Sequence, residues 1–241
     1  MRKYASRNNF VKNKTILGLG MGRFLFAAVC TPVLVVCGLL TGQAWYEIAL
    51  SVFSVVKLMC LAEGRRAGCA LGVVYCLAYG ALYFSRQVYG LAFYHALFAA
   101  PVYAVSFFAW SKHRADKAVK AKRLNWKQGA LSLGACLGAF MGIFLLLKAT
   151  GSASALWDSL SLSLLGPGLV LLLLRYVENW CFKIAGYSAT LILWAVKAAQ
   201  DAANLNFVLV SAVTVAVTAM GFANWLRLER RAGSAEPVGL G

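Results

Sequence analysis

The chain of 241 residues carries a net charge of +16, yet 61% of its residues are hydrophobic and only 13% are charged. A mean hydropathy of +0.70 is too high for a soluble domain, and the apolar residues come in blocks of about twenty. The sequence therefore predicts an all-α polytopic membrane protein. A transmembrane β-barrel is excluded because the blocks are apolar on every side, and a nucleic-acid partner is disfavoured because Lys and Arg occupy only the gaps between blocks.

The first half of the chain is predicted to contain four membrane spans. Residues 1–42 form a basic N-terminus and an extra first span. Residues 43–111 hold three further spans, of which the first carries Glu47 and Lys57 and the last is interrupted by His95. These three spans lie at about residues 45–62, 67–84 and 89–110.

The second half is predicted to contain four more spans. Residues 112–152 form a basic linker and a linker helix, and residues 153–227 hold three spans before a flexible tail at 228–241. Gly166-Pro167-Gly168 interrupts the first of these three spans, where the proline removes a helix hydrogen bond and the glycines permit a bend. The four spans lie at about residues 131–147, 156–174, 180–196 and 205–226.

The distribution of basic residues predicts the orientation in the membrane. With eight spans both termini lie on one side, and segments on that side carry eighteen Lys or Arg against three on the other. Because loops rich in Lys and Arg stay in the cytoplasm, we expect both termini to be cytoplasmic.

The two halves of the chain resemble each other when the sequence is shifted by 115 residues. Residues 107–110 (FFAW) then align with 222–225 (FANW), and Glu63 aligns with Glu178. Spans two to four are thus interpreted as a copy of spans six to eight, which gives a 1+3+1+3 order of two parallel three-helix repeats joined by a linker helix. Such repeats place a substrate site between the halves. Chance matching of interfacial tryptophans is the alternative.

Cysteine and histidine are not arranged for disulfides or metal binding. The seven cysteines lie inside or at the edges of apolar blocks, with no pair at ligand spacing and only two histidines in the chain. We expect neither a metal nor a cofactor, and we find no nucleophile paired with a base and no phosphate-binding loop.

A polar and aromatic cluster at the start of the seventh span is the strongest candidate site. Asn179 offers two donors and an acceptor, which suit an amide or a hydroxyl on a ligand. Trp180, Tyr187, Trp194 and Tyr94 are suited to hold a flat or cationic ligand by stacking. Tyr187 and Trp194 are predicted to share a helix face with Trp180, although each could instead be a packing residue or an interfacial anchor.

Four ionisable residues are further candidates, because charge inside a span is costly. Asp158 and Glu47 are placed near the outer interface, where they either bind a substrate or are simply solvated. His95 lies in the middle of its span, and Glu178 either belongs to the site or caps a helix.

These motifs resemble the Pnu family of bacterial vitamin and nucleoside transporters over about residues 44 to 226. Residues 158–161 (DSLS) resemble the family's Asp-x-Leu-Thr, and residues 178–180 (ENW) reproduce its Glu-Asn-Trp twenty residues later. Leu193-Trp194 and Lys197 fall where members have Leu-Tyr and Lys. In the first half, the pattern is matched by Trp45, Tyr46, Glu47, Phe53, Glu63, Gly72, Tyr79, Tyr83 and Tyr89.

The resemblance implies a SWEET-like homotrimer in the bacterial inner membrane that takes up nicotinamide riboside by facilitated diffusion. A cytoplasmic kinase that phosphorylates the substrate would make uptake one-way and would be the functional partner. It also implies that Asn179 and Trp180 bind the substrate together with Tyr187, Trp194 and Tyr94, assisted by Asp158.

The chain departs from the family pattern at residues that bear on the substrate. Lys183 stands where carriers of nicotinamide riboside have a second tryptophan, Tyr187 where they have an acid or amide, and His95 where they have a glutamine. Thiamin, riboflavin and deoxynucleosides therefore remain alternatives. Outside the family, a lipid-modifying membrane enzyme and a structural subunit are the rival interpretations.

Overall fold

The structure is a computed structural model. It describes residues 15–16, 19–85, 89–115, 118–151 and 154–234. The basic residues of the first 14 positions, Arg86, Lys117 and the end of the predicted tail, residues 235–241, lie outside the described residues.

The described chain is almost entirely helical, which confirms the predicted fold class. The long helices are α1 (Met21–Leu40), α2 (Trp45–Ala62), α3 (Arg66–Ser85), α6 (Trp126–Ala149), α7 (Ala155–Leu173), α8 (Asn179–Gln200) and α9 (Leu205–Ser234). Between α3 and α6 lies a helical stretch made of α4 (Tyr89–Phe93), a π-helical turn η1 (Tyr94–Ala99) and α5 (Ala100–Ser111). The smaller elements are the 3₁₀ turn η2 (Ala202–Asn204) and the antiparallel strand pairs β1 (Thr15–Ile16) with β2 (Leu19–Gly20) and β3 (Arg114–Ala115) with β4 (Ala118–Val119).

Six helical segments of the described residues are long and apolar enough to cross a membrane. They are Trp45–Ala62, Arg66–Phe84, Leu91–Ser111, Trp126–Ala149, Ala155–Leu173 and Leu205–Arg230. The apolar part of α1, Leu25–Leu40, is shorter, and α8 carries two lysines, two tryptophans and a tyrosine along its length. The predicted total of eight spans therefore stays a prediction.

Prolines and glycines modify these helices without breaking them. Pro167 lies inside α7, which stays helical on both sides of it. Pro101 lies at the start of α5, directly after η1, and the helical stretch continues through it. Gly168 instead allows α7 and α8 to approach, because a Cβ atom there would lie 3.0 Å from Cβ of Phe182.

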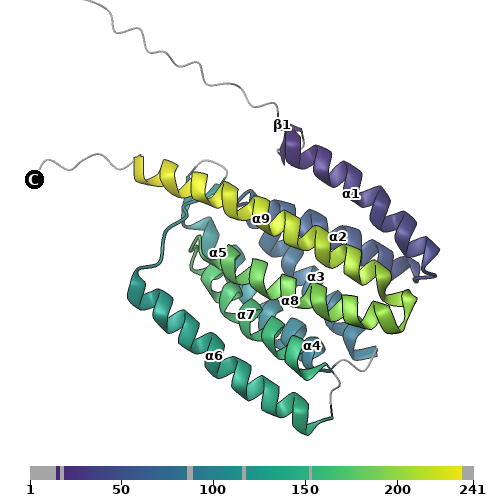
Figure 1. The fold of residues 1–241 in the computed structure, drawn as a ribbon. Coiled ribbons are helices and arrows are strands. Elements are labelled where there is room, and N and C mark those ends of the chain that lie inside the picture. The colour runs from purple at the N-terminus through teal and green to yellow at the C-terminus, as the bar shows by residue number, and fades with distance from the viewer. Residues whose placement is uncertain (1–14, 17–18, 86–88, 116–117, 152–153, 235–241) are drawn as a thin grey trace, which may run out of the picture.

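The helices form a bundle flanked by two outer helices (Figure 1). In the bundle, α3 packs between α2 and α5, and α8 packs between α7 and α9. The two groups meet through contacts of α2 with α9 and of α5 with α7. On one side α1 packs against α2 and α9, and on the opposite side α6 packs against α7 (Figure 1). Only 6% of α6 is buried, so it lies at the periphery.

Two similar turns end α2 and α7 at one end of the bundle. Gly64 and Arg175 follow these helices, and both have a φ of 68°. The backbone N–H of Gly64 donates to the Leu61 carbonyl (2.9 Å), and that of Arg175 donates to the Leu172 carbonyl (3.0 Å). A left-handed residue in this position is the usual end of a helix, and glycine is the residue that adopts it without strain.

Two tryptophans tie the groups of helices together at these turns. Nε1 of Trp225 on α9 donates to the Leu61 carbonyl at the end of α2 (3.0 Å). Nε1 of Trp110 on α5 donates to the Leu172 carbonyl at the end of α7 (3.3 Å). Both indoles are fully buried, and their ring centroids lie 5.6 Å apart. Each group of helices is thereby bonded to the other at the same position.

The basic linker crosses this end of the bundle, which we call the linker end. The Val119 N–H donates to the Gly64 carbonyl (3.0 Å), and the Lys122 N–H donates to the Arg175 carbonyl (3.1 Å). The linker thus touches both left-handed turns. It ends at Asn125, whose side chain and that of Gln128 form a reciprocal capping box at the start of α6.

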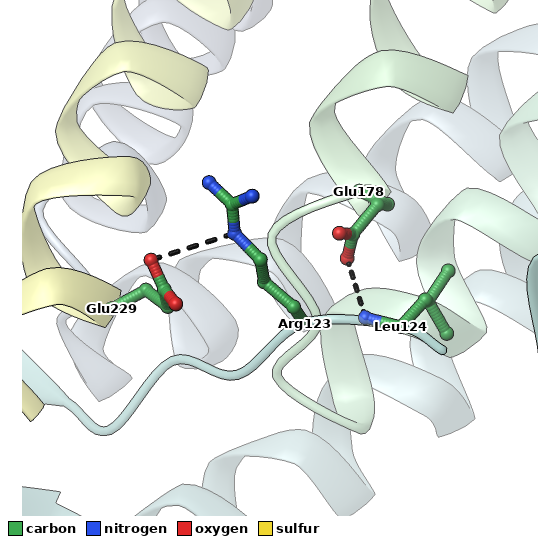
Figure 2. A network of polar contacts seen from close by, with 4 residues as sticks. All are labelled: Arg123, Leu124, Glu178 and Glu229. Carbon is green, nitrogen blue, oxygen red and sulfur yellow. Dashed lines mark hydrogen bonds and ion pairs between the residues drawn. The ribbon is translucent and has the colours of Figure 1, made fainter. Parts of the chain in front are cut away.

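Glu178 and Glu229 hold the linker from opposite sides (Figure 2). Oε2 of Glu178 accepts a hydrogen bond from the Leu124 N–H (3.1 Å), and Oε2 of Glu229 lies 3.5 Å from Nε of Arg123. Glu178 occupies the N-cap position of α8, but its side chain makes no capping hydrogen bond. Glu178 is thus found at the predicted cap position, but its carboxylate bonds to the linker and not to the first turn of α8.

Helix α9 continues past the predicted end of the last span. It runs to Ser234, so residues 228–234 of the predicted flexible tail are helical. The segment after Trp225 is rich in Leu, Arg and Ala, which favour helix, and Glu229 is held by Arg123.

Candidate functional site

A cavity of about 100 Å³ lies between the two groups of helices. Residues of α2, α3, α4, η1, α5, α7, α8 and α9 line it, so every helix of the bundle contributes. Its lining combines tyrosines, one histidine, two lysines, one aspartate and several hydroxyl groups. The cavity is therefore an aromatic and polar site in an otherwise apolar molecule.

Tyrosines of α3 and the histidine of η1 form the aromatic side of the cavity. Tyr75, Tyr79 and Tyr83 follow one another at intervals of four, which puts them on one face of α3. The His95 ring stacks on Tyr83 with centroids 5.6 Å apart and lies 6.0 Å from Tyr75 and from Tyr79. Nδ1 of His95 is buried and has no hydrogen-bond partner among the described residues. The ring nitrogen is thus available to a ligand.

One face of α8 forms the opposite side. Lys183, Tyr187, Thr190 and Trp194 all line the cavity at helical spacing. The Trp194 ring stacks on Phe207 of α9, with centroids 4.4 Å apart and planes inclined by 20°. This contact fixes the indole at the edge of the cavity, which the ring helps to line.

Hydroxyl groups and a carboxylate supply directional polar contacts. Oγ1 of Thr190 lies 2.6 Å from Oγ of Ser161 on α7, so the two hydroxyls share a hydrogen bond. Asp158, in the first turn of α7, also lines the cavity, and its Oδ2 accepts a hydrogen bond from Ser154 (2.7 Å). Asp158 marks the end of the cavity that is farthest from the linker.

Two lysines line the cavity nearer the linker end. Lys57 of α2 and Lys183 of α8 are 3% and 2% exposed. Nζ of Lys57 lies 3.4 Å from the centroid of the Tyr75 ring, and Nζ of Lys183 lies 4.9 Å from that of Trp180. Such cation–π contacts offset part of the cost of burying the ammonium groups.

Five of the eight predicted site residues line the cavity. They are Tyr94, His95, Asp158, Tyr187 and Trp194. They come from three separate helical segments, and the fold brings them together as the sequence predicts. Whether they bind a substrate stays a prediction.

Asn179 and Trp180 lie outside the cavity lining, at the linker end. Nδ2 of Asn179 donates to the Tyr176 carbonyl (2.6 Å), while its Oδ1 is buried and has no hydrogen-bond partner among the described residues. Trp180 is fully buried against α9, where a Cβ atom at Gly221 would lie 2.6 Å from its ring. Its ring also packs edge-on against Trp225, with centroids 5.8 Å apart. Trp180 reaches the cavity only through its contact with Lys183.

Glu47 is buried beside the aromatic side of the cavity and does not line it. It lies in the first turn of α2, is 3% exposed, and is a charged neighbour of Tyr79. Tyr79 in turn exchanges side-chain hydrogen bonds with Tyr75 and Ser51. Glu47 is therefore placed to influence the tyrosines and is not a solvated interfacial acid.

Some cavity residues were absent from the predicted site. Tyr75, Tyr79, Tyr83, Lys57 and Lys183 all line it, as do hydroxyl residues of α7 to α9. The four-residue spacing of the tyrosines and the presence of two lysines inside apolar blocks were signals that pointed to them. The hydroxyl residues gave no such signal, because serine and threonine are common in membrane helices.

A second hollow, with a volume of about 800 Å³, separates α6 from α7 and η1. Its walls are mostly aliphatic and aromatic, with Gln128 and Ser132 among the few polar residues. It offers no cluster of groups that would orient a polar ligand. Within the described residues, no group of three or more His, Cys, Asp or Glu side chains is placed to hold a metal ion.

Comparisons with known proteins agree on one family. The family model described as "Nicotinamide mononucleotide transporter" matches residues 44–227. A relative from Neisseria mucosa, named "Nicotinamide riboside transporter PnuC", is 25% identical over 196 residues, which cover 78% of this chain and 74% of that protein. The structure described as "Crystal structure of the Vitamin B3 transporter PnuC" has the same fold, with a TM-score of 0.78, 22% identity, and coverage of 90% of this chain and 95% of that one.

Proposed function

Because the chain belongs to the nicotinamide mononucleotide transporter family, we propose that this membrane transporter takes up a vitamin-type nucleoside through the cavity between its helix groups. Its similarity to a protein named as a nicotinamide riboside transporter makes nicotinamide riboside the first substrate to test. Family membership makes the chain a transporter and not an enzyme, so lipid modification is set aside.

The cavity lining is the observation that carries this proposal. A nucleoside has a flat ring and a hydroxyl-rich sugar, and it needs stacking surfaces together with donors and acceptors. Tyr94, Tyr187 and Trp194 supply aromatic surface, and His95 and Asp158 supply polar groups. The pair of hydroxyls at Ser161 and Thr190 is suited to bind the sugar.

Asn179, Trp180 and Glu47 hold indirect roles in this proposal. The Trp180 ring contacts the ammonium group of Lys183, and Asn179 is the first residue of α8. Glu47 acts on the cavity through Tyr79. Direct contact of these three residues with the substrate stays a prediction.

The architecture proposed for transport is 1+3+1+3, with eight spans. The matching bonds of Trp110 and Trp225 to Leu172 and Leu61 support two equivalent repeats, α2–α5 and α7–α9. The extra helices α1 and α6 then flank the repeats, in keeping with their places in Figure 1. Residues 43–111 and 153–227 are the proposed repeats.

The linker end is proposed to face the cytoplasm of a bacterial inner membrane, with both termini on that side. The basic linker and the Lys and Arg residues near the start of α3 and the end of α9 lie at this end, which agrees with the positive-inside rule. We further propose a homotrimer, facilitated diffusion and trapping by a cytoplasmic kinase, which feeds the nucleoside into NAD biosynthesis. The exposed apolar surface of α6 is available for contacts between subunits.

Uptake of labelled nicotinamide riboside into cells that lack other transporters tests the proposal. We expect the chain to restore uptake, and the double variant Tyr187→Ala/Trp194→Ala to abolish it. Trp126→Ala is the matched control, because this tryptophan is 79% exposed and lies outside the cavity. If the chain transports none of nicotinamide riboside, thiamin, riboflavin and deoxynucleosides, the proposal fails. Transport of one of the other three compounds alone would retain the site and replace the substrate.

A further inference from the structure

We propose that Lys57 and Lys183 form an anion-binding subsite within the cavity, which receives a carboxylate or phosphate carried by the transported nucleoside. This inference rests on the proposed function. It narrows the proposed substrates to nucleosides that carry an anionic group. The subsite makes an anion-bearing pyridine nucleoside a better ligand than nicotinamide riboside, which carries a positively charged ring.

The two lysines line the same cavity from different helices. Lys57 comes from α2 and Lys183 from α8, both line the cavity, and each is a few per cent exposed. Lys57 is a charged neighbour of Lys183. Two ammonium groups in one buried cavity repel each other, and an anion bound between them relieves this repulsion.

The Lys183 amine lacks an acceptor. Its Nζ is buried and makes no hydrogen bond within the described residues, although it has three N–H donors to offer. The centroid of the Trp180 ring lies 4.9 Å from Nζ of Lys183. The ring attracts the ammonium group electrostatically but offers it no hydrogen-bond acceptor. A buried cation with unused donors is the arrangement in which a ligand oxygen gains most.

The acids of the site are too distant to serve as partners. The Lys183 side chain lies opposite Gly168 on α7, whose Cβ position is 3.6 Å from Cγ of Lys183. Asp158 precedes Gly168 by ten residues of continuous helix, or roughly 15 Å at 1.5 Å per residue. Glu47 precedes Lys57 by the same interval on α2. Both acids therefore lie toward the other end of the cavity.

Apart from His95, which is a neighbour of Lys57, the side chains around the lysines are neutral aromatic rings or thiols. Tyr75 and Tyr103 face Lys57 at 3.4 and 5.9 Å, and Cys76 and Cys69 are neighbours of Lys57 and Lys183. None of these provides a fixed negative charge. The ligand is then the source of the anion, and the subsite selects for it.

Binding to the purified full chain, measured by calorimetry, tests the subsite. The three ligands are nicotinamide riboside, its analogue with a carboxylate in place of the amide, and nicotinamide mononucleotide, which carries a phosphate. We expect at least one anionic ligand to bind about tenfold to a hundredfold more tightly than nicotinamide riboside, the range given by hydrogen bonds to charged groups. Preference for the carboxylate or for the phosphate identifies which anion the subsite accepts.

Methionine variants locate the effect. Lys183→Met and Lys57→Met should each remove about tenfold or more of the preference for the anion. Lys197→Met is the matched control and should leave it unchanged, because Lys197 lies on the same helix and 5.3 Å from a tryptophan ring, that of Trp194, but does not line the cavity.

Nicotinamide riboside binding as tightly as both anionic ligands overturns the subsite while leaving the proposed function intact. An anion preference that survives in both methionine variants also overturns it. Failure of all three ligands to bind removes the proposed function and the subsite together. If a variant does not fold, the relative affinities of the three ligands for the unaltered chain still test the anion subsite.

Discussion

Trp180 and Trp194 lie on the same helix, but Trp180 is enclosed by α9 and Trp194 borders the cavity. Trp180 belongs to a tryptophan cluster with Trp110 and Trp225, in which all three rings are fully buried. Trp194 stacks on the ring of Phe207 and lines the cavity. The same residue type therefore serves packing at the linker end and borders the cavity nearer the far end, where we propose that it contacts the ligand.

The difference lies in what the neighbouring helix provides. Gly221 of α9 leaves a gap that the Trp180 indole fills, with the built Cβ position 2.6 Å from the ring. At Trp194 the neighbouring helix presents Phe207, which stacks on one face only. A motif tryptophan is thus not evidence of ligand contact until its partner on the next helix is known.

Trp180→Ala should have the largest effect. Removal of this indole leaves a cavity among buried helices and should lower the free energy of unfolding by about 3–5 kcal/mol. Thermal unfolding of the purified protein measures the loss. Gly221→Ala should also destabilise, by about 1–3 kcal/mol, because its Cβ meets the indole.

The matched control for the glycine is Gly138→Ala on α6, which has open space at its Cβ position and should be neutral or slightly stabilising. If Trp180→Ala kept the unfolding free energy of the unaltered chain but lost substrate binding, Trp180 would belong to the binding site. The contrast between Trp180 and Trp194 would then be wrong.

Trp194→Ala should act on binding more than on folding. Loss of a stacking surface should weaken nucleoside binding by about tenfold to a hundredfold, or roughly 1–3 kcal/mol. Binding measured on protein whose unfolding temperature is known separates the two effects. If Trp194→Ala bound the nucleoside as tightly as the unaltered chain, Trp194 would not be the stacking surface. The tyrosines of α3 would then be the candidates for it.

Trp110→Phe and Trp225→Phe sharpen the comparison within the tryptophan cluster. Each removes one indole hydrogen bond to a carbonyl that keeps its backbone partner, so each should cost about 1 kcal/mol. If the two repeats are equivalent, the two losses in unfolding free energy should match. A cost confined to one variant argues against equivalence.

Arg175→Gly should have the smallest effect and the opposite sign. Arg175 adopts the left-handed conformation that Gly64 adopts in the other turn, and a side chain there is strained. The glycine variant should gain up to about 1 kcal/mol of unfolding free energy, while Gly64→Ala should lose about as much. Chemical denaturation of the two variants, measured side by side, gives the sign of each change in unfolding free energy. Destabilisation by Arg175→Gly would contradict the equivalence of the turns that end α2 and α7.

The sequence predicted the helices better than the site. Hydropathy located the apolar blocks within a few residues, because a long apolar run satisfies its backbone only as a helix. Pro167 and its glycines suggested a break that α7 does not show. The end of α9 was placed too early, because its final turns are polar and are held by an ion pair to the linker.

The site was predicted in part, for a reason visible in α8. Helical spacing correctly grouped Tyr187 with Trp194, but it also included Trp180, which is on the same face and contacts α9 at its end of the helix. Spacing gives the direction of a side chain and not the distance to the next helix. Tyr75, Tyr79 and Tyr83 share a face of α3 just as clearly, but their spacing does not show that this face borders the cavity.

The sequence by itself determined that this protein is helical and belongs to a membrane, since those properties depend on composition and run length. That it carries two similar halves stays a prediction. Only the tertiary structure decided which aromatic residues border the cavity and that Lys57 and Lys183 both line it. Those facts depend on how closely α2, α7, α8 and α9 approach, and the approach is set by small residues such as Gly168 and Gly221 on facing helices. Helix spacing along one chain segment carries no information about that distance.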